Sequence, residues 1–106
     1  MTVVTVTGLA GGRGLRIVGE LDASNVFDLT ERLEETVTGE GDVTLDLRDL
    51  RFIDSAGIHA LIRAAKQLEG RGRMRLLVVP GPVLRVIELV GIRESLPHVD
   101  VETEER

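Results

Sequence analysis

The residues of this chain with the clearest capacity for chemistry are Asp54 and Ser55, which stand between two apolar patterns of different period. Apolar and polar residues alternate over 43–47, which predicts a strand. Beyond Ser55 the apolar residues follow the 3.6-residue period of a helix; they are Ile58, Leu61, Ile62, Ala65 and Leu68. A small hydroxyl is therefore expected at the start of a helix, just beyond the carboxyl end of a central strand. Ligands and partners of open α/β sheets bind at that edge.

The simplest interpretation of Asp54 and Ser55 is a helix cap, in which a side-chain oxygen accepts a hydrogen bond from a free backbone N–H. A serine hydrolase would need small residues on both sides of the nucleophile, as in Gly-x-Ser-x-Gly. Here Ile53 stands where the first glycine should be. His59 follows only four residues after Ser55, whereas a catalytic histidine normally comes from another part of the fold. These features argue against a hydrolase and predict that His59 is a surface residue.

Asp22 is a second carboxylate at a point where a strand gives way to a helix. Loops that follow parallel strands open at the same edge of a sheet, so we expect Asp22 near Asp54 and Ser55, with the turn 80–82 as a third wall. The alternative for Asp22 is a helix cap. A metal site would need a further ligand, and strand alternation assigns the nominal candidate, Asp46, to the polar face of its strand. We therefore predict neither a metal nor a cofactor.

The composition excludes several classes of function. The chain has 106 residues, a net charge of −5 and only two aromatic residues, Phe27 and Phe52. An acidic chain with so few stacking side chains is a poor match for nucleic acid. The absence of cysteine removes disulfides, thiolate chemistry and cysteine-bound zinc. Neither a secretory signal nor an apolar run of the roughly 20 residues that cross a membrane is visible, so we expect one cytoplasmic domain over 1–106.

The alternation of element types predicts an α/β fold of order β-β-α-β-α-β-α-β, with a mixed sheet of four or five strands and three helices. The strands are expected at 2–7, 15–18, 43–47, 74–79 and 98–101, with a hairpin loop at 8–14. The helices are expected from a cap at Asp22 or Ser24 to Gly39, over 55–69, and from Pro82 to Gly91. The apolar run 74–79 predicts a strand buried on both faces. The third helix is expected to bury Val83, Val86, Ile87 and Val90.

Three sequence blocks carry a resemblance to a known family. They are Gly-Glu-Leu-Asp at 19–22, Leu-Asp-Leu at 45–47 followed by Phe-Ile-Asp-Ser-Ala-Gly-Ile at 52–58, and Val-Leu-Arg-Val-Ile-Glu-Leu-Val-Gly-Ile at 83–92. Together, in this order and at these separations, the blocks resemble STAS domains, and in particular anti-sigma factor antagonists. The resemblance extends over almost the whole chain and implies the STAS fold.

The resemblance also implies a role for Ser55. In such antagonists the matching serine is phosphorylated by an anti-sigma factor that is itself a serine kinase. The unphosphorylated form binds this kinase and frees a sigma factor, and a serine phosphatase reverses the phosphorylation. The domain would thus be a substrate and a binding module without catalysis of its own, as a monomer or a weak dimer. The implied partner surface consists of Asp22, Asp54, Ser55, Ala56, Gly57 and Ile58.

An alternative function is open at this point. A STAS-like subunit of a phospholipid-transport complex, or a signalling scaffold, would use the region around Ser55 for docking and would not be phosphorylated there. If Ser55 is phosphorylated, the added charge lies at a helix N-terminus, where it is stabilised by about 0.3–1 kcal/mol. We therefore expect phosphorylation to leave the helix intact and to act at the partner's surface.

Overall fold

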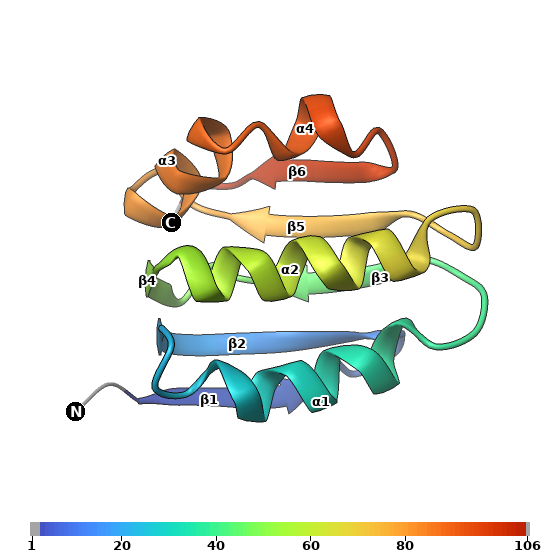
Figure 1. The fold of residues 1–106 in the computed structure, drawn as a ribbon, viewed down its shortest axis with the longest axis horizontal. Coiled ribbons are helices and arrows are strands. Elements are labelled where there is room, and N and C mark those ends of the chain that lie inside the picture. Colours follow the sequence, from blue (N-terminus) through green and yellow to red (C-terminus); the bar gives the residue numbers. More distant parts are fainter. Residues whose placement is uncertain (1–2, 106) are drawn as a thin grey trace.

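Helices cover one face of a mixed six-stranded sheet in this computed structural model, which describes residues 3–105 (Figure 1). The strands are β1 (Val4–Gly8), β2 (Gly14–Leu21), β3 (Val43–Asp46), β4 (Leu50–Ile53), β5 (Met74–Val78) and β6 (Val99–Thr103). The helices are α1 (Val26–Val37), α2 (Ser55–Leu68), α3 (Pro82–Leu89) and α4 (Ile92–Ser95). Among the described residues, no helix combines the length and the apolar character that a membrane crossing requires.

The strand order confirms the predicted α/β fold. The sheet runs β1-β2-β3-β5-β6, and β4 pairs with β2 beyond the part of β2 that pairs with β3. The β1–β2 pair is an antiparallel hairpin, and all other pairs are parallel. The carboxyl ends of the parallel strands therefore meet at one edge of the sheet, on the left of Figure 1, where α1, α2 and α3 begin.

Two short elements and the strand count differ from the prediction. Strand β4 and the single-turn helix α4 lie where no strand or helix of that extent was predicted, so the described sheet has six strands where four or five were predicted. The burial of β4 runs buried, exposed, exposed, buried, which lacks the alternation that identifies a strand. Its strand character depends on pairing with β2, a contact between distant parts of the chain.

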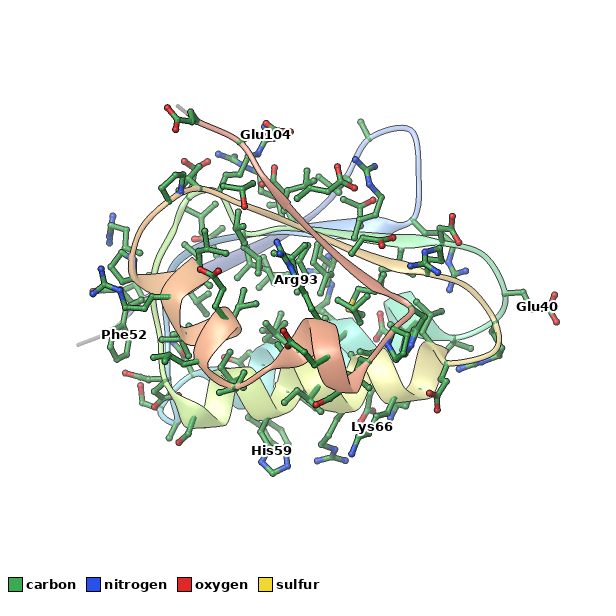
Figure 2. All side chains as sticks on the ribbon, turned by 90° about the horizontal axis from the view of Figure 1, so that it is seen from above. Glu40, Phe52, His59, Lys66, Arg93 and Glu104 are labelled. Atoms are coloured by element: carbon green, nitrogen blue, oxygen red, sulfur yellow. The ribbon has the colours of Figure 1, made fainter. Side chains whose placement is uncertain are left out.

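The core lies between the sheet and the helices and is aliphatic. Leu33 of α1, Leu61 and Leu68 of α2, and Ile17 and Leu45 of the sheet are fully buried. Within residues 3–105 no helix lies on the opposite face, as Figure 2 shows in a view along the sheet. The prediction that 74–79 is buried on both faces is therefore wrong in part. The apolar segment 74–79 is typical of a strand between two layers of helices, but in this fold a single layer of helices covers it.

Charged residues occupy the face of the sheet without helices. Arg75 on β5 pairs with Glu102 on β6 at 2.7 Å, and Arg48 pairs with Asp46 at 2.8 Å and with Glu104 at 2.8 Å. The hydrogen bonds from Arg48 hold the pKa of Asp46 below its usual range and outweigh the opposing effect of burial. Asp46 is thus engaged in a structural ion pair, and no group of three potential metal ligands exists among residues 3–105.

The pairing of β2 is irregular at Gly19, close to the end of the strand that leads to the predicted site. The pairing of β2 changes register between Gly19 and Glu20, where β4 has replaced β3 as its neighbour. Gly19 has a φ of +111°, and a Cβ at this position would lie 2.2 Å from the carbonyl oxygen of Val3. Only glycine fits these two constraints. Beyond the register shift, at which Arg51 of β4 is the extra residue, β2 continues to Leu21 beside Ile53.

We predict that Gly19→Ala destabilises the protein by about 1–3 kcal/mol, because an alanine must adopt a left-handed φ and contact the backbone of Val3. The matched control is Gly12→Ala in the β1–β2 loop, where no atom lies within 4 Å of the added Cβ. The control should change stability by less than about 0.5 kcal/mol. Urea denaturation followed by far-UV circular dichroism gives both values. Equal stability of the two variants would contradict the backbone constraint assigned to Gly19.

Candidate functional site

Asp54 caps helix α2 and defines where it begins. Its backbone is extended, with φ −104° and ψ −173°, and one carboxylate oxygen accepts a hydrogen bond from the N–H of Gly57 at 3.1 Å. The carbonyl of Asp54 accepts the first intrahelical bond, from Ile58, at 3.0 Å. The helix start predicted from the sequence and the cap are both confirmed. Ser55 is consequently the first residue of α2.

The second carboxylate oxygen of Asp54 connects two loops. It accepts a hydrogen bond from the backbone N–H of Ala23, in the turn after β2, at 3.2 Å. The backbone N–H of Asp54 in turn donates to the carbonyl of Leu21 at 3.1 Å. The expected proximity of the β2–α1 and β4–α2 loops is therefore confirmed, and Asp54 is the residue that joins them.

Asp22 does not cap helix α1, contrary to one of the predicted alternatives. Its carboxylate accepts hydrogen bonds from the backbone N–H of Ser24 at 2.9 Å and from the Ser24 hydroxyl at 2.6 Å. The helix begins at Val26 after Asn25, whose side chain makes no cap hydrogen bond. The Asn25 amide instead bonds the N–H of Asp22 and the carbonyl of Glu20. Local polar side chains thus stabilise a turn before the helix, and the predicted caps at Asp22 and Ser24 are wrong.

Ser55 is exposed at the surface. Within residues 3–105 its hydroxyl forms no hydrogen bond, and His59, one turn further along α2, is also exposed. Figure 2 shows His59 directed away from the sheet. The prediction that His59 is a surface residue is confirmed. The exposed Ser55 hydroxyl thus lies at a capped helix start and is accessible from solvent.

The two residues that follow Ala56 are buried and fix the position of the helix start. A Cβ on Gly57 would lie 2.7 Å from Cγ1 of Ile53 and 2.9 Å from Cδ2 of Leu21, so α2 rests directly on the ends of β4 and β2. Ile58 is only 5% exposed. Of the six residues expected to form a partner surface, Ser55 is exposed, three are half-buried and two are buried; the half-buried ones are Asp22, Asp54 and Ala56.

A groove between α2 and α3 begins at Ser55. It has a volume of about 560 Å³ and is lined by Ile53, Asp54, Ser55, Ile58, His59, Ile62, Lys66, Val86 and Val90. Val86 and Val90 were expected in the core of the third helix. Val86 is half-buried and Val90 is 45% exposed, while Val83 and Ile87 alone of the predicted stripe are buried. The turn 80–82, predicted as a third wall beside Asp22, Asp54 and Ser55, is not part of the groove lining, to which α3 contributes Val86 and to which the adjoining Val90 also belongs.

A second, smaller groove lies between α1 and α2. Its volume is about 280 Å³, and its lining includes Val26 and Glu34 on α1 and Ala56, His59 and Arg63 on α2. His59 lines both grooves and therefore marks the ridge between them. Neither groove was predicted, because the 3.6-residue period identifies an apolar face but not the gap between two neighbouring helices.

The fold and the site define an α/β domain that presents a serine at the capped start of a helix, beside an apolar groove. The chain belongs to the STAS domain family, since the STAS domain model matches residues 4–105. A solved structure of an anti-sigma factor antagonist from Mycobacterium paratuberculosis has a similar fold. Its TM-score is 0.79 at 19% sequence identity, with 94% of this chain and 86% of that chain covered. No curated protein matches the chain.

We predict that Asp54→Ala lowers the free energy of unfolding by about 1–2 kcal/mol, because it removes a helix cap and the bond to Ala23. Asp54→Asn retains an acceptor oxygen for the cap and should lose less than about 1 kcal/mol. Urea denaturation at neutral pH compares the two variants with the wild type. An alanine variant as stable as the wild type would show that the carboxylate does not join the two loops in solution.

Proposed function

We propose that this chain is an anti-sigma factor antagonist that is switched by phosphorylation of Ser55. In its unphosphorylated form it binds an anti-sigma factor that is also a serine kinase, and a sigma factor is thereby released. Phosphorylation of Ser55 by that kinase dissociates the complex, and a serine phosphatase restores the binding form. The chain acts in the cytoplasm as one domain, a monomer or a weak dimer, and is acted upon without catalysing a reaction.

The observation that carries this proposal is the exposed Ser55 hydroxyl at the first position of α2. A kinase needs its acceptor hydroxyl accessible and well positioned, because phosphoryl transfer depends mainly on positioning and electrostatics. The Asp54 cap provides the positioning. Membership of the STAS family supports the assignment, and so does the likeness in fold to a protein described as an anti-sigma factor antagonist.

The helix start is suited to carry a phosphate. Phosphorylation adds about −1.5 to −2 charge, which a helix N-terminus stabilises by about 0.3–1 kcal/mol. The Ser55 side chain is exposed, so the phosphate displaces nothing from the core. The neighbouring carboxylate of Asp54 is held by two backbone N–H groups. The switch therefore changes the surface offered to the partner and leaves the fold unchanged.

The six predicted residues divide into two roles in this proposal. Asp22, Asp54, Ser55 and Ala56 have atoms at the surface and contact the partner. Gly57 and Ile58 are buried and support Ser55 from below, since Gly57 allows α2 to rest on Ile53 and Leu21. The two carboxylates keep the surroundings of Ser55 acidic, which increases the electrostatic difference between the two phosphorylation states.

We expect incubation with ATP and a cognate anti-sigma factor kinase to add one phosphate, seen by intact-mass spectrometry, and Ser55→Ala to abolish it. The other two serines provide matched controls. Ser24→Ala and Ser95→Ala should still accept the phosphate, because Ser24 is engaged with Asp22 and Ser95 lies on α4. Phosphate retained by the Ser55→Ala protein would contradict the assignment of the site.

We also expect Ser55→Asp to keep the far-UV circular dichroism spectrum of the wild type while its affinity for the kinase falls by roughly a hundredfold, equivalent to about 3 kcal/mol. The physical reason is that a charge is desolvated at the interface without disturbing the capped helix. Ser55→Asn, of the same size but uncharged, should lose about tenfold or less. An unfolded Ser55→Asp protein, or one that binds like the wild type, would contradict this account.

The alternative function gives a different pattern in the same experiments. A STAS-like subunit of a phospholipid-transport complex, or a scaffold, would bind its partner through this surface and accept no phosphate. A cognate kinase encoded in a neighbouring reading frame favours the antagonist, whereas neighbouring transporter genes favour the alternative. A partner complex that forms with wild-type protein and is unaffected by ATP and kinase would replace the proposed function.

A further inference from the structure

Basic side chains on the exposed sheet face and on α2 differ in whether they form ion pairs. On the sheet face without helices, Arg48, Arg73 and Arg75 each form an ion pair with a carboxylate. On α2, Arg63 and Lys66 are exposed and form no ion pair with any of residues 3–105. Figure 2 shows Lys66 directed away from the sheet, on the same side as His59. The outward surface of α2 is therefore basic in a chain whose net charge is −5.

Of these two cations, Arg63 lines the groove between α1 and α2, whereas Lys66 borders the groove between α2 and α3. Ile62 on α2 and Val86 and Val90 on α3 form its apolar walls, and Lys66 and His59 complete the lining. Ser55 lies at one end and Lys66 follows 11 positions later, which is about 16 Å along the helix at 1.5 Å per residue. That length matches about three turns of a docked helix, which contacts a groove through residues at i, i+3, i+4 and i+7.

We propose that the groove between α2 and α3 binds an acidic amphipathic helix of the anti-sigma factor, a proposal that rests on the function proposed above. The apolar face of that helix packs on Ile62, Val86 and Val90. One of its carboxylates pairs with Lys66, and its other end lies beside Ser55 without covering the hydroxyl. Charge complementarity at the Lys66 end of the groove selects an acidic occupant, because Lys66 has no carboxylate partner among residues 3–105, whereas the one carboxylate that lines the groove, Asp54, lies at the Ser55 end and is bonded to two backbone N–H groups.

This occupant gives a physical reason for release. A phosphate on Ser55 adds about −1.5 to −2 charge at the end of a groove that holds an acidic helix. Like charges brought together in a partly desolvated interface repel, so the phosphorylated chain loses the helix while its own fold is retained. A basic occupant would be held more tightly after phosphorylation, which is the opposite of the proposed switch.

Two pairs of variants test this inference, with binding measured by calorimetry against the kinase that phosphorylates Ser55, with ADP present so that no phosphate is transferred. Lys66→Glu reverses a charge in the groove, and Arg85→Glu makes the same change on the exposed face of α3 outside it. Val90→Ser removes an apolar wall, and Leu89→Ser changes a neighbour that is 79% exposed and does not line the groove. Circular dichroism confirms that each variant is folded.

We expect Lys66→Glu and Val90→Ser each to weaken binding about tenfold, and Arg85→Glu and Leu89→Ser to stay within about twofold of the wild type. Wild-type affinity should fall with rising salt, and Lys66→Glu should flatten that dependence. Unchanged or tighter binding by Lys66→Glu overturns the inference. A chain dimer lost in Val90→Ser, with kinase binding intact, also overturns it in favour of self-association. If the kinase phosphorylates Ser55 and binds the groove variants with wild-type affinity, the groove inference is refuted and the proposed function stands. If the wild type binds no kinase, both proposals are refuted.

Discussion

The site depends on the carboxylate of Asp54, whose two oxygens have two different structural partners. One accepts from the N–H of Gly57 and starts α2, and the other accepts from the N–H of Ala23 in the loop after β2. Because both bonds come from backbone groups, they orient the helix start without depending on the rotamers of other side chains. The hydrogen bonds of Asp54 therefore hold Ser55 at the surface, at the point where the two loops are joined. A phosphate on Ser55 would lie at this fixed helix start.

The distribution of charge gives the two faces of the domain different properties. On the exposed face of the sheet, ion pairs such as Arg75–Glu102 join neighbouring strands and leave little net field. On α2, Lys66 and Arg63 have no carboxylate partner among the described residues, so their field reaches solvent. An acidic protein can thus present a locally basic edge for docking, since screening confines surface fields to about 8 Å at physiological salt.

The elements that were predicted correctly are those whose signal is local. Helix α2 has an apolar stripe and an Asp-Ser start within a few residues of each other, and both features survive in the fold. The predicted caps of α1 were wrong because polar groups of Asp22, Ser24 and Asn25 form hydrogen bonds with one another within the turn. The sequence alone does not show which of these competing hydrogen bonds forms. Strand β4 was not predicted because its four residues lack the alternation of a strand and form one only by pairing with β2.

The sequence by itself determined the order of the main elements, the aliphatic core and the position of Ser55 at a helix start, because each depends on periodicity or on neighbouring residues. Only the tertiary structure decided what surrounds Ser55. Val86 and Val90 share an apolar stripe with Val83 and Ile87, yet the first two line a groove and the last two are buried. A helical period specifies which residues share a face. The packing of α3 beside α2 decides which part of that face meets the sheet and which part remains open to a partner.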